Sequence, residues 1–150
     1  VPSSSFQLLL DQALPPLAMN CFVKHLLPGG VLAMPFMTLW KEGDPLESEF
    51  TRDVIRPEDG ATIRRWSYTR FDPETDFEHT IDRYQIIIDG EITASEEHDQ
   101  SPATRSYTQE QAIALYHAAG LQDIQVFHEF TFEPARPDDT VFSVLGFKPE

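Results

Sequence analysis

Residues 25–37 constrain the fold most, because a helix must end there and a buried strand must begin within a few residues. Pro28 lacks a backbone N–H, and Gly29-Gly30 accepts positive φ angles, so a helix end and a tight turn are predicted. Val31–Phe36 is apolar throughout, which is typical of a strand covered on both faces, and Pro35 lies near its end, where a missing donor is tolerated. Such a strand, expected at the centre of its sheet, indicates an α/β fold.

Composition excludes several classes of function. The chain has 150 residues, enough for one domain with a core, and a net charge of −14 that repels phosphate backbones and anionic lipid. We therefore expect no nucleic-acid partner and no membrane partner. The single cysteine, Cys21, cannot form an intramolecular disulfide, and its place on a predicted helix suggests a small buried apolar side chain. Without a signal-peptide pattern or a transmembrane run, the expected location is the cytoplasm.

Two longer helices and one short helix are predicted. A short helix is expected over residues 8–12, with Ser5 as a candidate cap, before Pro15-Pro16 break the chain. Residues 17–27 then repeat apolar side chains at helical spacing. Thr108-Gln109-Glu110-Gln111 matches a capping box, and the helix that it opens is expected to end at Gly120.

The remaining regular segments alternate with period two, which predicts strands. Asp89-Gly90 is the strongest hairpin signal in the chain. Together with two other turn-rich segments it predicts an antiparallel meander of about four strands within Phe50–His98. Further strands are expected at Ile124–Phe132 and at Thr140–Lys148.

Five segments, taken in order, resemble the carboxy-terminal half of a class I S-adenosylmethionine-dependent methyltransferase: 1–9 (VPSSSFQLL), 27–32 (LPGGVL), 107–111 (YTQEQ), 118–124 (AAGLQDI) and 142–148 (FSVLGFK). The resemblance implies a partial Rossmann-like sheet in which Val31–Phe36 is the fifth strand of the family. The antiparallel seventh strand should then lie between the fifth and sixth. Residues 1–150 would form one partial domain, and residues 50–98 an antiparallel insertion within it.

The resemblance also implies methyl transfer from S-adenosylmethionine to an acceptor, expected to be a small molecule. Members of this family bind the cofactor with a glycine-rich loop after the first strand and an acidic residue after the second. This sequence has no such loop and begins at Val1 rather than Met. We therefore expect a truncated chain that lacks the amino-terminal half and is inactive by itself.

Candidate site residues follow from the resemblance, which assigns neither a catalytic residue nor a metal ligand. The loop after the fourth strand would lie beside the transferable methyl group, although the same residues also suit a plain helix cap. Aromatic side chains on an amphipathic strand more often serve ordinary packing than line an acceptor pocket, and arginines on so acidic a chain more often pair with nearby carboxylates. The expected cofactor contacts are Ser3, Ser4, Ser5 and Phe6, and the expected substrate contacts are Gln7, Trp40, Arg65, Trp66, Tyr68 and Arg70.

Three alternatives remain open at this point. His79 and His98 would share one face of the hairpin and could form a two-histidine metal or acid–base site. A small α+β module could instead hold an apolar ligand without catalysis, with Trp66, Tyr68, Tyr84 and Ile86 inside. A fragment with an open sheet edge at the Val1 side is also expected to form a homodimer.

Overall fold

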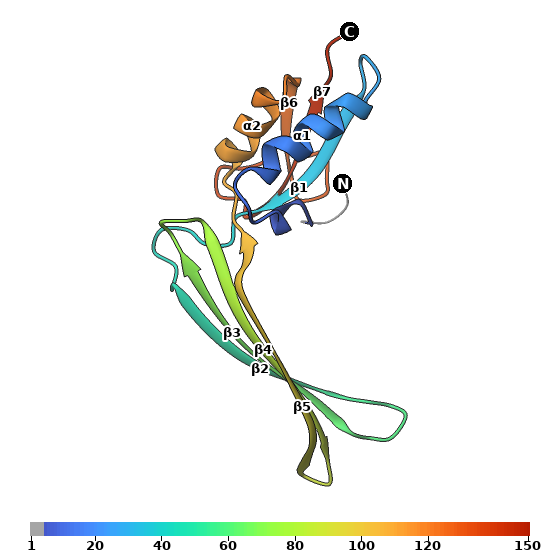
Figure 1. Cartoon of the computed structure of the whole chain (residues 1–150), viewed down its shortest axis with the longest axis vertical. Coiled ribbons are helices and arrows are strands. Elements are labelled where there is room, and N and C mark those ends of the chain that lie inside the picture. Colours follow the sequence, from blue (N-terminus) through green and yellow to red (C-terminus); the bar gives the residue numbers. More distant parts are fainter. Residues whose placement is uncertain (1–4) are drawn as a thin grey trace. The chain divides into compact units, whose positions relative to one another are not determined.

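The computed structural model describes residues 5–150 and divides the chain into two compact units (Figure 1). The α/β unit comprises Val1–Lys41 and Thr104–Glu150, and the meander unit comprises Glu42–Ala103. In residues 5–150 no helix combines the length and apolar character that crossing a bilayer requires. The elements are, in order, η1 (Ser5–Leu8), α1 (Leu14–His25), β1 (Val31–Met37), β2 (Glu47–Ile55), β3 (Thr62–Asp72), β4 (Phe77–Ile88), β5 (Glu91–Arg105), α2 (Gln109–Ala118), β6 (Gln122–His128) and β7 (Val141–Phe147).

The sheet of the α/β unit has the strand order β1-β7-β6, with β7 antiparallel to both neighbours. This is the predicted order of fifth, seventh and sixth strands, and it makes β1 and β6 parallel to each other. The expectation that Val31–Phe36 would be central is wrong for the described residues, in which β1 pairs only with β7. The middle position belongs to β7, because it hydrogen-bonds on both sides.

One face of this sheet is covered by both α1 and α2. Alternate residues of β1 and β7 are buried on that face, and they form one core cluster with residues of the two helices: Met19, Leu32, Met34, Phe36, Ala112, Tyr116, Phe142 and Val144. The intervening residues Val31 and Ala33 are exposed. The sequence predicted that β1 is covered on both faces. This is wrong at Val31 and Ala33, because α1 and α2 both cover the opposite face.

The first helix begins earlier than predicted. Pro15 and Pro16 do not break the chain but lie in the first turn of α1, where a helix needs no N–H donors. The expected helix over 8–12 is replaced by the 3-10 helix η1, which contains Ser5 instead of being capped by it. Cys21 is exposed, which corrects the expectation of burial, because the buried side chains of α1 occupy the opposite side of the helix.

The turn after α1 forms as the proline and glycines predict. Gly29 has a φ of +71°, and Gly30 N donates to Leu27 O at 2.8 Å. Lys148 then closes the helix end, because its Nζ donates to the carbonyl oxygens of Val23 at 2.9 Å and Leu26 at 2.8 Å. A cation at this end also complements the helix dipole.

The capping box of α2 is confirmed in both directions. Gln111 N donates to Thr108 Oγ1 at 3.2 Å, and Thr108 N donates to Gln111 Oε1 at 2.8 Å. Gly120, at a φ of +81°, follows the helix as expected. The next strand, β6, is shorter than predicted and ends at His128, because Glu129 adopts a positive φ of 47° and turns the chain.

The meander unit is a four-stranded antiparallel sheet in the order β2-β3-β4-β5. Asp89 and Gly90 have φ angles of 52° and 82°, as a two-residue hairpin turn with two left-handed residues requires. The predicted meander is thus confirmed. Its strands extend beyond the expected limits, from Glu47 to Arg105, because β5 continues to the point where the chain re-enters the α/β unit.

Gly146 provides a first prediction about stability. A Cβ atom at this position would lie 2.6 Å from Cδ1 of the buried Tyr116 and 3.2 Å from Cβ of Leu121. We expect Gly146→Ala to lower the free energy of unfolding by roughly 1–3 kcal/mol, the usual cost of overpacking a core. Urea denaturation followed by circular dichroism would measure this. Gln125→Ala, at an exposed position of the same sheet, is the control, and equal stability of the two variants would contradict the packing shown here.

Candidate functional site

The carboxyl ends of β1 and β6 lie at one edge of the α/β sheet, because these strands are parallel. Thr38 N donates to Thr140 O at 2.8 Å, which places the residues after β1 beside the start of β7. We call this region the carboxyl edge: η1, residues 37–41, 105–107 and 128–140. Ligands of α/β sheets bind outside the carboxyl ends of strands, so this edge is the first place to look for a site.

Gln7 holds three segments of the carboxyl edge together. Its Oε1 accepts from Met37 N at 2.7 Å, and its Nε2 donates to the carbonyl oxygens of Met37 at 3.0 Å and Arg105 at 2.5 Å. The side chain is 0% exposed. The sequence predicted that Gln7 binds substrate. In the structure, both ends of its amide are already occupied by three hydrogen bonds to the backbone.

Phe6 is likewise part of the core. It is 3% exposed, and its ring centroid lies 5.8 Å from that of Phe36, 6.1 Å from that of Tyr107 and 6.5 Å from that of Phe22. Of the other expected cofactor contacts, Ser5 is exposed, whereas Ser3 and Ser4 lie outside the described residues.

Residues 105–107 run beside the end of β1. Tyr107 N donates to Met37 O at 3.2 Å, Thr38 Oγ1 donates to Tyr107 O at 2.9 Å, and Leu39 N donates to Ser106 Oγ at 2.9 Å. Burial raises the pKa of the Tyr107 phenol, and the nearby Arg105 partly opposes that effect. Trp40, the expected acceptor contact at this edge, is half-buried.

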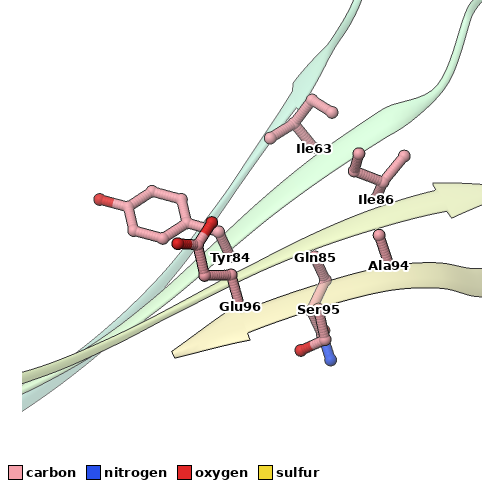
Figure 2. Close-up of a pocket in the computed structure, with 7 residues that line it drawn as sticks. All are labelled: Ile63, Tyr84, Gln85, Ile86, Ala94, Ser95 and Glu96. Carbon is pink, nitrogen blue, oxygen red and sulfur yellow. The ribbon is translucent and has the colours of Figure 1, made fainter. Parts of the chain in front are cut away.

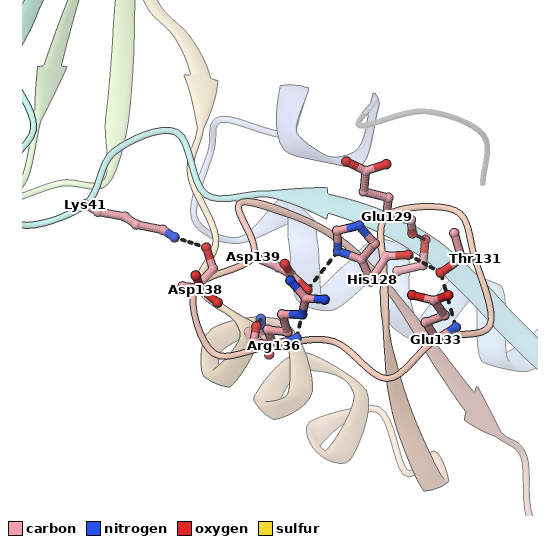
Figure 3. Close-up of polar contacts among 10 residues, drawn as sticks. Lys41, His128, Glu129, Thr131, Glu133, Arg136, Asp138 and Asp139 are labelled. Atoms are coloured by element: carbon pink, nitrogen blue, oxygen red, sulfur yellow. Dashed lines mark hydrogen bonds and ion pairs between the residues drawn. The ribbon is translucent and has the colours of Figure 1, made fainter.

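His128 and Asp139 form a pair at the opposite end of the carboxyl edge (Figure 3). Nδ1 of His128 lies 3.0 Å from Oδ2 of Asp139, whose side chain is 10% exposed. Asp139 also accepts from Arg136 N at 2.8 Å. The Arg136 N–H, and after it His128, hold the pKa of the Asp139 carboxyl below its usual value. The contact between His128 and Asp139 is an ion pair only when the imidazole is protonated.

The sequence analysis did not single out this pair. No motif links the two residues, which are brought together by the turn after β6 and by the approach to β7. Lys41 reaches the same segment, with its Nζ donating to the carbonyl oxygen of Asp138.

The meander unit separates the remaining expected substrate contacts into two faces. Paired residues of adjacent strands share a face, so Trp66, Tyr68 and Arg70 lie on one side of β3, the Trp66 face. Arg65 and Ile63 lie on the other side, with Ile86 and Tyr84 of β4, and we call it the Ile86 face. The sequence already placed Arg65 apart from the other three through its strand period of two.

Trp66 lies in a polar network on its face. Its Nε1 donates to Glu49 at 2.6 Å, and the guanidinium carbon of Arg83 lies 5.2 Å from the centroid of the indole. Arg83 in turn pairs with Glu97 at 2.7 Å. Tyr68 lies two residues further along β3 on the same face. Its pKa is raised by desolvation and, to a smaller extent, by the neighbouring Glu47. An aromatic ring held between polar groups is suited to a polar small molecule.

The arrangement does not support the alternative of an apolar pocket lined by four expected side chains. Trp66 and Tyr68 lie on the face opposite Tyr84 and Ile86. The four side chains therefore do not enclose one cavity within the sheet, since neighbouring residues of a strand point to opposite sides.

The two-histidine site is also not formed. Nδ1 of His79 lies 2.7 Å from Ser101 Oγ, whereas the ring of His98 lies 5.9 Å from that of Tyr84, which belongs to the opposite face of β4. The expectation of a shared face was wrong because it assumed an unbroken register from the turn. No group of three or more metal-binding side chains occurs within residues 5–150.

Comparison with known proteins was made for the chain and for its structure. No protein-family model matches the sequence, and no curated protein matches it. The structure matches an S-adenosylmethionine-dependent methyltransferase from Clostridium acetobutylicum with a TM-score of 0.73 and 14% identity, over 98% of this chain and 56% of that protein.

Two further matches concern methyltransferases of sugars. The sugar N-methyltransferase KedS8 from a Streptoalloteichus species matches with a TM-score of 0.64 and 20% identity, over 99% of this chain and 54% of its own. The amino pentose methyltransferase CalS10 from Micromonospora echinaspora matches with a TM-score of 0.64 and 17% identity, over 95% and 55%.

The chain has the fold of the carboxy-terminal half of a class I S-adenosylmethionine-dependent methyltransferase. It spans little more than half the length of the methyltransferases that it matches. The strand order β1-β7-β6 with an antiparallel β7 is the part of this methyltransferase fold that the sequence resemblance predicted. Because the identities are low, the likeness establishes the fold alone.

Gln7 provides a second prediction. Gln7→Leu should leave the N–H of Met37 and the carbonyl oxygen of Arg105 without the amide that bonds to them, whereas Met37 O still accepts from Tyr107 N. We expect the free energy of unfolding to fall by about 2 kcal/mol or more. Chemical denaturation would measure the loss. Gln12→Leu, the same substitution at an exposed position, is the control. Equal effects of the two changes would contradict a structural role for the Gln7 amide.

Asp139 provides a third prediction, on pH dependence. Its pKa is lowered in the folded protein, so its contribution to stability is present above the ordinary aspartate pKa and is lost as pH falls through the lower folded value. Asp139→Asn should therefore lower the melting temperature at pH 7, and the difference from the wild type should shrink as pH falls below 4. Scanning calorimetry at pH 7, 5 and 3 would test this. A difference that grows on acidification would contradict it.

Proposed function

We propose that this chain forms part of an S-adenosylmethionine-dependent methyltransferase that acts on a small-molecule acceptor. The methyltransferase fold is the single observation that carries the proposal. The net charge of −14 supports a small acceptor over a nucleic acid, because an acidic surface repels phosphate backbones. The alternative of a binding module without catalysis has less support, since its four lining residues are divided between two faces.

Of the four residues expected to contact the cofactor, Phe6 does not suit that role, Ser5 is exposed, and Ser3 and Ser4 lie outside the described residues. Phe6 packs among three other aromatic rings, and Gln7, which was expected to contact the substrate, already bonds to backbone groups through both ends of its amide. Phe6 and Gln7 are therefore buried structural residues of the carboxyl edge and do not present a surface to a ligand. Accordingly, we propose that the chain alone binds S-adenosylmethionine weakly or not at all.

The acceptor proposal rests on the Trp66 face and on the names of two matching proteins. KedS8 is a sugar N-methyltransferase and CalS10 an amino pentose methyltransferase. We propose an acceptor of the same polar class for this chain, with Trp66, Tyr68 and Arg70 as contacts. Aromatic rings beside carboxylates, as at Trp66 and Glu49, suit a polar ring that carries a cationic amine.

Self-association and a cytoplasmic location complete the proposal. The single cysteine supports a reducing compartment, since it cannot form a disulfide within the chain. Within residues 5–150, the one-sided cover of the α/β sheet and the unpaired edge of β1 support a homodimer, because exposed edges and apolar faces favour association.

The fourth prediction tests the methyltransferase proposal by NMR. Millimolar S-adenosylmethionine should shift amide resonances of η1, residues 37–41 and 105–107, without saturation. Adenosine triphosphate is the control ligand, which the acidic protein should repel. Shifts confined to other regions would contradict the proposed function. Saturation at micromolar concentration would instead contradict weak binding by the chain alone.

A further inference from the structure

The meander unit is a single layer of sheet. Within Glu42–Ala103 the structure contains strands and turns but no helix that covers either face. Stable domains normally bury an apolar face of a sheet against a second layer. The two faces of this sheet differ strongly, and that difference shows which one requires a cover.

The Ile86 face carries an apolar row across the strands. Val54 of β2, Ile63 of β3 and Ile86 of β4 are directly paired neighbours. Ala94 of β5 continues the row, and Figure 2 shows Ile63, Ile86 and Ala94 on the same side of the sheet. Gln85 and Ser95, the chain neighbours of Ile86 and Ala94, point to the other side. The Trp66 face is instead filled by hydrogen bonds and ion pairs.

The apolar surface is large enough to matter. Phe50, Val54, Tyr84 and Ile88 lie on the Ile86 face and are 38–51% exposed. With Ile63, Ile86 and Ala94 they expose roughly 400–500 Å² of apolar surface, by the usual side-chain areas. That is the size of the largest patch on a typical monomer and about half of what each partner contributes to a standard interface.

A second row carries charges at its two ends. Arg52 of β2 pairs with Arg65 of β3, which pairs with Tyr84 of β4, and Glu96 of β5 lies beside Tyr84 (Figure 2). Arg65 is neutralised within the chain, 2.8 Å from Asp82. Arg52 is exposed and has no ion pair among residues 5–150. Glu96 lies 3.2 Å from Nε2 of His98, which is charged only when protonated, so the Glu96 charge is not cancelled while that imidazole is neutral. From one edge strand to the other, the row then contains a cation, a neutral pair, an aromatic ring and an anion.

We propose that the Ile86 faces of two copies of this chain pack against each other about a two-fold axis parallel to the strands. Such an axis places β2 of one copy over β5 of the other and keeps each row at the same height. The apolar row Val54-Ile63-Ile86-Ala94 then meets itself in reverse order. The charged row does the same, so Arg52 meets Glu96 of the second copy and Arg65 meets its Tyr84.

Charge complementarity and area therefore select a second copy as the occupant. Each interface would contain two Arg52–Glu96 contacts and a continuous apolar centre, which is the composition of a stable isologous interface. The proposal gives a surface to the self-association proposed above and is independent of methyl transfer. It also moves the interface from the expected Val1 side to the meander unit.

Charge exchange provides the sharpest test, as a fifth prediction. Sedimentation equilibrium of the wild-type chain should show a dimer. Arg52→Glu and Glu96→Arg should each raise the dissociation constant about tenfold or more, and the double exchange should recover most of that loss. Ile86→Asp should weaken the dimer further, whereas Gln85→Asp, on the other face of the same strand, should not.

Cross-linking provides a second measurement that does not depend on affinity. In a Cys21→Ser background, Val54→Cys combined with Ala94→Cys, two positions that face each other across the proposed axis, should give bis-maleimide-linked dimers. The neighbouring pair Asp53→Cys with Ser95→Cys, on the other face, should not. A monomeric wild-type chain would refute both self-association and this interface. A dimer that tolerates Ile86→Asp, shows no recovery in the double exchange and cross-links equally from both faces would refute this interface alone.

Discussion

The hydrogen bonds of the Gln7 amide are the interaction on which the arrangement of the α/β unit depends. The chain leaves this unit at Lys41 and returns at Thr104, so the two crossing segments are far apart in sequence. One buried side chain binds the backbone of both, at Met37 and Arg105. A buried amide with all three contacts satisfied stabilises the junction, whereas a partly satisfied one would cost more than an apolar replacement. One side chain therefore joins η1 to both crossing segments within the α/β unit.

The sequence was informative wherever local chemistry decides the structure. The capping box at Thr108, the glycine turn before β1 and the Asp89-Gly90 hairpin each need only a few neighbouring residues, and each was predicted. The local pattern was misleading at Pro15-Pro16. Prolines can end a helix or occupy its first turn, and here they occupy the first turn of α1. The central place of β7 could be expected only through the family resemblance. Periodicity alone assigned the middle of the sheet to the more apolar β1, although pairing on both sides, and not apolarity, defines a central strand.

Side-chain positions at the candidate site were less predictable than the strands that carry them. The period of two correctly put Trp66, Tyr68 and Arg70 on one face and Arg65 on the other. The strand period could not show that Phe6 and Gln7 would be buried. Their burial depends on contacts with Phe36, Tyr107 and Arg105, which are distant in sequence. The His128–Asp139 pair was missed for the same reason, since two turns of no recognisable motif bring its members together. Contacts between distant segments are the information that a single sequence carries least directly.

The middle position of β7 also has a consequence for the order of synthesis. A ribosome delivers β1 and β6 before β7, so neither strand can make its pairing with β7 until that later strand has emerged. The meander unit, by contrast, is built from strands that pair with their immediate successors and can form during translation. During that interval, η1 and α1 are the described elements already made that can cover the apolar face of β1. The α/β unit thus completes its fold last, although its first helix and strand are made first.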